Sequence, residues 1–141
     1  MIYATVSDIC TRYQRRQLDM LTAVKTDSGE PDDAIAQTAL DDAGALIDSY
    51  ISARYTLPLS VIPGALAQAC TVIAWYYLSD QRATEQTTQR YRDAIKWLES
   101  VRDGKTPLGV DASTATAPEG ENLAQVVSDA LVFGRNQKGF L

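Results

Sequence analysis

Five aspartates in one segment are the residues of this sequence best suited to chemistry. They are Asp32, Asp33, Asp41, Asp42 and Asp48, and no lysine or arginine stands between Lys25 and Arg54. Carboxylates can bind a divalent cation or exchange protons when several of them converge on one point. On a helix, however, the adjacent Asp41 and Asp42 point about 100° apart, and Asp48 lies about two turns further on. We therefore predict no metal and no cofactor here, and interpret these acids as a solvated or subunit-contacting face.

The other common catalytic groups are missing or isolated. The chain has no histidine, which removes Ser-His and Cys-His pairs, and its two cysteines, Cys10 and Cys70, form no CxxC motif. There is no glycine-rich phosphate loop and no GxSxG nucleophile elbow. We predict a reduced, intracellular protein that is not an enzyme. A carboxylate-metal enzyme that uses the Asp32–Asp48 face stays as an alternative.

The charge balance argues against nucleic-acid binding by bulk charge. Thirteen Lys+Arg against eighteen Asp+Glu give a net charge of −5. A mild basic excess near residues 82–105 could lie against the acidic segment of a neighbouring copy. We predict such a subunit interface between two sets of residues, with acids Asp41, Asp42 and Asp48 on one side and bases Arg90 and Lys96 on the other. A small regulatory bundle that binds DNA through Gln86, Gln89, Arg90 and Lys96 remains a second hypothesis.

Helical periodicity indicates which elements position these residues. Ser7 followed by Asp8 predicts a helix start, and we expect a break near Arg15 that gives two short helices. Pro31 is suited to the first position of a long helix over roughly residues 31–53. The segment 55–63 contains Pro58 and cannot be helical through it, so we predict an extended connection.

Two further helices follow. Residues 65–78 are apolar nearly all round, which is typical of the buried centre of a bundle. The apolar window around them falls short of the ~20 residues that a membrane span needs, so we predict no membrane partner. Thr84 is expected to cap the last helix and Gly104 to end it. The predicted fold is all-α, a small bundle of four or five helices over residues 1–105.

Residues 106–141 are predicted to be a linker and an extended C-terminal arm. The stretch 111–120 consists mainly of small residues, and an apolar run from Leu123 to Phe133 follows it. We expect the arm to contact neighbouring subunits or partner proteins. The predicted contact residues are Leu131, Val132, Phe133, Arg135, Phe140 and Leu141.

Several stretches together resemble the small head–tail connector proteins (neck adaptors, or head-completion proteins) of Mu-like tailed phages and prophages. These stretches are Met1–Thr5 with Ser7-Asp8, Asp41–Ala43, Ile47–Tyr50, Ser52–Leu59, Asp80–Glu85, Arg90–Leu98, Gly104-Lys105, Pro107–Gly109, Val132–Arg135 and Lys138–Phe140. The resemblance covers nearly the whole chain except the Ala/Ser/Thr linker. Arg15-Arg16-Gln17 departs from it, since a glycine and acids are expected there.

The resemblance implies a structural virion protein with a helical core and arms or loops that reach neighbouring proteins. Such a protein forms a ring under the portal, completes the DNA-filled head and provides the docking surface for the tail. The implied partners are the portal protein, a tail-side neck or tail-terminator protein, and copies of the same chain in a ring that portal symmetry suggests is dodecameric. Genomic DNA would pass through the ring without sequence-specific binding. The implied location is the neck of the virion, with the host cytoplasm during assembly.

Overall fold

The computed structural model describes residues 1–110, and these form five α-helices and one short 3-10 helix. The elements are α1 (Val6–Arg12), α2 (Arg15–Ala23), α3 (Asp33–Ile51), α4 (Gly64–Ser79), η1 (Asp80–Arg82) and α5 (Glu85–Arg102). No strand occurs within this range, which confirms the prediction of an all-α bundle. Most of the predicted arm, residues 111–141, lies outside the described residues.

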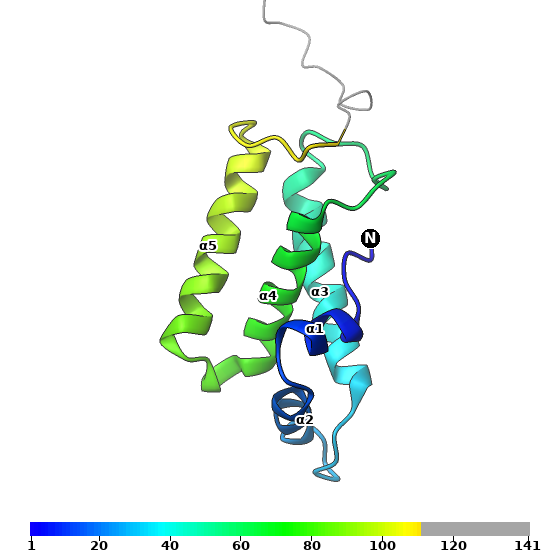
Figure 1. Ribbon diagram of the computed structural model, residues 1–141, viewed down its shortest axis with the longest axis vertical. Coiled ribbons are helices and arrows are strands. Elements are labelled where there is room, and N and C mark those ends of the chain that lie inside the picture. The colour runs from blue at the N-terminus through cyan, green and yellow to red at the C-terminus, as the bar shows by residue number, and fades with distance from the viewer. Residues whose placement is uncertain (111–141) are drawn as a thin grey trace, which may run out of the picture.

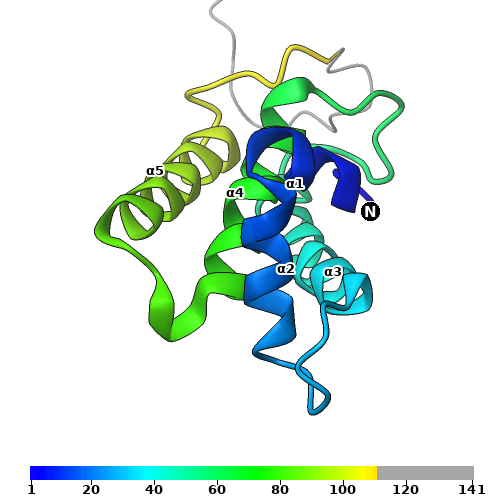
Figure 2. The same cartoon turned by 60° about the horizontal axis from the view of Figure 1, so that its bottom comes forward.

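Helices α3, α4 and α5 run alternately up and down, with α4 between the other two (Figure 1; Figure 2). The central position of α4 follows from its sequence, because both α3 and α5 pack on it and only a helix that is apolar nearly all round can satisfy two such contacts. Ile73 and Ala74 in its middle are fully buried. This confirms the prediction for residues 65–78.

The two N-terminal helices lie across the α3–α4 face, and their break is confirmed near Arg15. The predicted cap at Ser7 is wrong, because Thr5 holds that position. Thr5 and Asp8 form a reciprocal capping box, in which each side chain accepts a hydrogen bond from the other residue's backbone N–H. Between the two helices, the ring of Tyr13 stacks on Trp75 of α4 with centroids 4.0 Å apart.

The long helices begin and end close to the predicted residues. α3 begins at Asp33 and not at Pro31, because the Asp32 carboxylate accepts a hydrogen bond from the Ala34 N–H at 2.8 Å and so caps the helix. Thr84 caps α5 as predicted. Gly104 follows α5 with φ +76°, a conformation in which glycine carries no side-chain penalty.

α3 ends at Ile51, two residues before its predicted end, and the predicted connection 55–63 contains no helix. Residues that follow α5 lie against this connection. The Arg54 Nε donates to the Arg102 carbonyl at 3.0 Å, and the Leu108 N–H donates to the Tyr55 hydroxyl at 3.3 Å. Leu108 is buried, so residues 106–110, assigned from sequence to the linker, pack on the bundle. The division at 105/106 stays a prediction. Within residues 1–110, no helix is both long and apolar enough to cross a bilayer.

Candidate functional site

A polar clamp fixes the N-terminal segment on α3. The Met1 ammonium group donates to Asp48 Oδ2 at 2.7 Å, and the Tyr3 hydroxyl donates to Asp48 Oδ1. The segment can approach the helix because residue 44 is glycine, and a Cβ there would lie 2.8 Å from the Met1 carbonyl oxygen. Burial first, and then the hydrogen bond to Asp48, raise the pKa of Tyr3 above its ordinary value. Tyr3 therefore stays a proton donor to Asp48.

The clamp turns Ile2 outward. Its two neighbours are held inward, Met1 by its ammonium group and Tyr3 by burial, while 68% of Ile2 is exposed. Val61 and Ile62, in the segment between α3 and α4, are 64% and 38% exposed. The Leu59 N–H of that segment lies 3.3 Å from Met1 Sδ, which joins it to the N-terminal residues.

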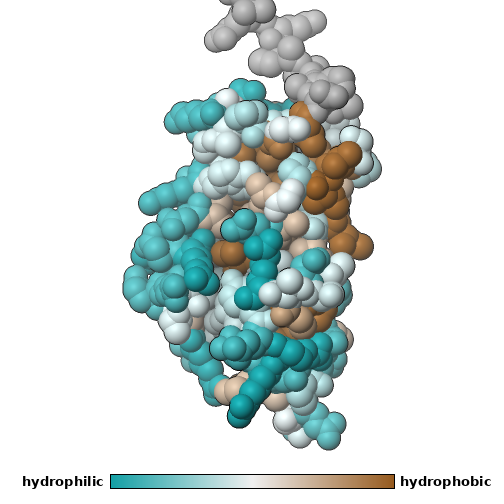
Figure 3. Space-filling model, in the orientation of Figure 1, coloured by the Kyte–Doolittle hydropathy of each residue, from teal (hydrophilic) through white to brown (hydrophobic). Residues whose placement is uncertain are grey.

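We call Ile2, Val61 and Ile62 the end patch. Figure 3 shows hydrophobic residues gathered along this edge, beside the α3–α4 connection. Apolar residues that face solvent together are a common mark of a protein contact site. Sequence reasoning missed these residues. The available signal was Val61-Ile62 in a segment that Pro58 and Pro63 keep out of a helix.

The acids predicted to form one subunit face differ in their exposure and in the contacts that they make. Asp41 and Asp42 are exposed on α3, whereas Asp48 is half-buried in the N-terminal clamp. Asp32 caps α3, and Asp33 pairs with Arg15 at 2.6 Å. No group of three acids, cysteines or histidines placed to hold a metal occurs in residues 1–110. The acids of the Asp32–Asp48 segment thus make separate contacts and do not converge on one point.

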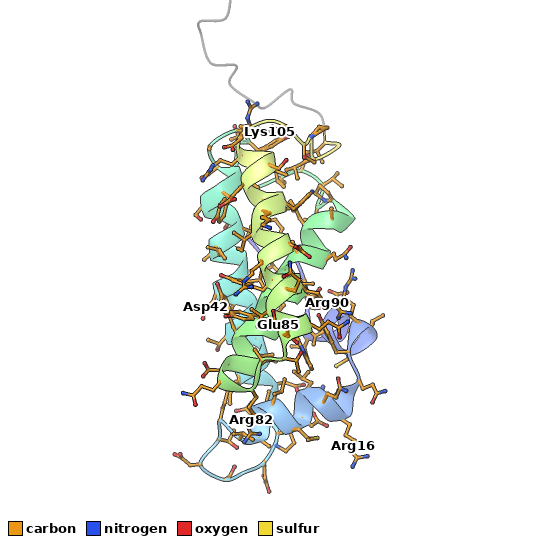
Figure 4. All side chains as sticks on the ribbon, turned by 90° about the vertical axis from the view of Figure 1, so that its left-hand side faces the viewer. Arg16, Asp42, Arg82, Glu85, Arg90 and Lys105 are labelled. Carbon is orange, nitrogen blue, oxygen red and sulfur yellow. The ribbon has the colours of Figure 1, made fainter. Side chains whose placement is uncertain are left out.

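The predicted bases Arg90 and Lys96 are both exposed on α5, but they do not share a face. Six residues apart, their side chains point about 120° away from each other. In Figure 4, Arg90 lies on the flank of α5 next to α1 and α2, and Asp42 lies on the opposite flank, on α3. Neither base, nor Asp42, forms an ion pair with another residue of the described range. Opposite charges are thus displayed on different sides of one subunit.

A furrow runs between α4 and α5, with a mainly apolar upper part and a lower part that mixes apolar and polar side chains. Its upper part is a cavity of about 240 Å³ lined by Ala65, Gln68, Ala69, Val72, Ala94 and Trp97. Its lower part is a cavity of about 420 Å³ between α4, α5 and α2, with Trp75 on its floor and Arg82 and Arg90 on its rim. In Figure 3, hydrophobic side chains show between hydrophilic ones in the middle of this face. We call these two cavities together the α4–α5 furrow.

The remaining candidate groups offer little chemistry. Cys70 is buried, and desolvation raises the pKa of its thiol to about 12, which opposes thiolate formation.

The Gln89 side-chain amide donates to Asp93 at 2.8 Å on the same helix. Because Arg90 faces the furrow and Lys96 points elsewhere, α5 does not present the single basic and amide face that a recognition helix needs. The predicted contacts Leu131, Val132, Phe133, Arg135, Phe140 and Leu141 lie outside the described residues.

Comparison with known proteins places the chain among phage sequences. The model of the family described as "Bacteriophage Mu, Gp36" matches residues 3–127. "Gene product J" of Escherichia phage Mu is 57% identical over 141 residues, which cover all of both chains. "Mu-like prophage FluMu protein gp36" of Haemophilus influenzae is 39% identical over 142 residues, covering all of this chain and 99% of that protein.

Proposed function

The chain belongs to the Bacteriophage Mu Gp36 family, and on that premise we propose that it is a head–tail connector of a Mu-like tailed phage. In this role it is a structural, non-enzymatic protein of the virion neck. It binds under the portal protein as a ring, completes the DNA-filled head, and offers its other side to a tail-side neck or tail-terminator protein. It assembles in the host cytoplasm.

The observation that carries this proposal is the end patch. Ile2 is exposed because Met1 and Tyr3, on either side of it, are both fixed to Asp48. An apolar side chain held outward by its neighbours has already lost much of its conformational freedom, so less entropy is lost when a partner covers it. Such a preorganised apolar surface suits a protein whose task is to dock on others.

The charge distribution supports a ring of identical copies. Asp42 and Arg90 lie on opposite flanks and neither is paired within the described residues. A contact between two different faces of the same protein repeats head to tail, and it closes into a ring when the rotation between copies allows. We propose that Asp41 and Asp42 of one copy face bases on α5 of the next, with twelve copies matching the portal. The net negative charge of each copy would repel DNA phosphates, so that DNA slides through.

Mass photometry of the full chain mixed with its purified portal ring tests the proposal. We expect the portal particle to gain one layer of this chain, and the added mass gives the copy number. The double variant Ile2→Asp/Val61→Asp should lose this layer while keeping its helical content. Val24→Asp is the matched control, because Val24 is also an exposed valine but follows α2, away from the end patch.

Two outcomes would overturn the proposal. The first is a wild-type chain that stays monomeric and leaves the portal particle unchanged. The second is a double variant that binds the portal as well as Val24→Asp does. Salt-sensitive binding of duplex DNA by a chain that ignores the portal would instead favour the regulatory bundle.

A further inference from the structure

The α4–α5 furrow has the dimensions of a helix-binding groove. Its α4 side uses Ala65, Gln68, Ala69, Val72, Trp75 and Ser79. These positions recur every three or four residues, so they form one stripe about 20 Å long at 1.5 Å per residue. The facing side on α5 is formed by Gln86, Thr87, Arg90, Ala94 and Trp97. A groove of this length accommodates nearly four turns of a docked helix.

The chemistry of the furrow indicates what it would bind. Its floor is apolar, with Val72, Trp75 and half-buried Trp97. Arg82 and Arg90 on the rim form no ion pair with any acid of residues 1–110. A complementary segment therefore carries an apolar stripe at helical spacing together with acidic residues and no bases.

One segment of this chain has that pattern. Its apolar residues fall at i, i+3, i+4, i+7 and i+8, namely Leu123, Val126, Val127, Ala130 and Leu131. Glu119 and Glu121 precede the stripe, Asp129 falls within its span, and residues 111–133 contain no lysine or arginine. The segment therefore matches the furrow both in apolar spacing and in charge.

The segment can also reach the furrow of its own chain. Val110 is the last residue that the structure describes, and it packs against the core two residues after Leu108, which is hydrogen-bonded to Tyr55 of the α3–α4 connection. That connection ends where α4 begins, at Gly64. Twelve residues, 111–122, separate Val110 from Leu123. Such a linker extends to ~40 Å and has a root-mean-square span of roughly 19 Å. Its effective concentration at the furrow is then in the millimolar range, which lets even a weak contact form.

We propose that residues 123–131 dock in the α4–α5 furrow of the same chain as an amphipathic helix. The apolar stripe lies on Val72 and Trp97, and the acids lie near Arg82 and Arg90. Val132 points about 180° away from the centre of the stripe and stays available to a partner. The inference concerns the free subunit and does not depend on the connector proposal.

Acrylamide quenching of tryptophan fluorescence in the full chain tests this docking. The chain has two tryptophans, and both line the furrow. Trp75 is only 7% exposed and stacks on Tyr13, so a change in quenching reports mainly on the half-buried Trp97. We expect Val127→Asp, within the stripe, to remove the protection of Trp97. Val132→Asp, the same substitution on the opposite side, should quench as the wild type does. A thermal melt followed by circular dichroism verifies that the bundle is intact in both variants.

Measuring the quenching at two protein concentrations shows whether the docked segment 123–131 comes from the same chain or from another copy. Docking within one chain gives the same quenching at about 1 μM and at about 100 μM protein, because the effective concentration is set by the linker. Equal quenching of wild type and Val127→Asp would overturn the proposal. Protection that is lost on dilution would also overturn it, because the segment would then come from another copy. Neither result bears on portal binding, which the preceding experiment measures separately.

Discussion

Replacing Asp48 by asparagine tests the clamp that fixes the N-terminal segment. The asparagine would keep the size of the side chain and could still accept a hydrogen bond from the Tyr3 hydroxyl. It would lose the charge that the Met1 ammonium group contacts at 2.7 Å. The NH₂ group of the new side chain is a donor and would face the Met1 ammonium group, which is also a donor. The ammonium group would then have no charged partner.

The structure sets the size of the expected effect. Only 14% of the Met1 side chain and 25% of the Asp48 side chain are exposed, so solvent screens this pair less than a surface ion pair. A hydrogen bond to a charged group contributes about 1.5–3 kcal/mol, and partial exposure points to the lower half of that range. We expect Asp48→Asn to lower the free energy of unfolding by about 2 kcal/mol, or the Tm by roughly 8 °C.

Urea unfolding followed by circular dichroism measures this change, and Asp42→Asn is the matched control. Asp42 is on the same helix, is exposed, and has no ion pair among the described residues. Its substitution should change the free energy of unfolding by less than about 0.5 kcal/mol. If the two variants lose equal stability, the clamp does not hold the N-terminal segment, and the fixed position of Ile2 has no physical basis.

Two more predictions concern the same core. Gly44→Ala should lower the free energy of unfolding by about 1–3 kcal/mol, because the new Cβ would lie 2.8 Å from the Met1 carbonyl oxygen. Gly64→Ala is the control: a Cβ at residue 64 would have no atom within 4 Å, so this variant should be neutral or stabilising in the same urea titration. Burial raises the pKa of Tyr77 from 10.0 to about 12, so above pH 10 the unfolded state releases a proton that the folded state keeps, and stability falls. Thermal melts from pH 9 to pH 11.5 should show this loss, and Tyr77→Phe should reduce it; equal losses in both chains would contradict the cause.

The helices were predictable because their signals are local. The stretch 65–78 is apolar nearly all round, which favours a central position, and Thr84 and Gly104 have the residue types that begin and end helices. The errors were also local. Ser7 and Thr5 can both cap a helix, and only Thr5 has an acid three residues later to complete a capping box with it. Similarly, Asp32 competes with Pro31 for the start of α3 and provides the side-chain hydrogen bond.

The surfaces were less predictable because they depend on contacts between distant residues. Asp48 has the same residue type and nearly the same helical face as Asp41, so the sequence assigns both to one acidic surface. The difference arises from the Met1 ammonium group, 47 residues away in the chain, which approaches only because residue 44 has no side chain. Likewise, Ile2 looks like an ordinary core residue in sequence, and only the clamp on its two neighbours turns it outward.

The end patch also bears on how a ring could assemble from single subunits. Covering an exposed isoleucine or valine gains about 1–2 kcal/mol, so the three residues of the patch give only a few kcal/mol to each subunit. A contact of that size is too weak to hold one copy on a partner. Subunits joined side by side add these contacts together, since each bound neighbour raises the effective concentration of the next. The small, rigid patch therefore binds the partner too weakly to hold a single free chain. It becomes effective once the ring has closed and many copies bind together.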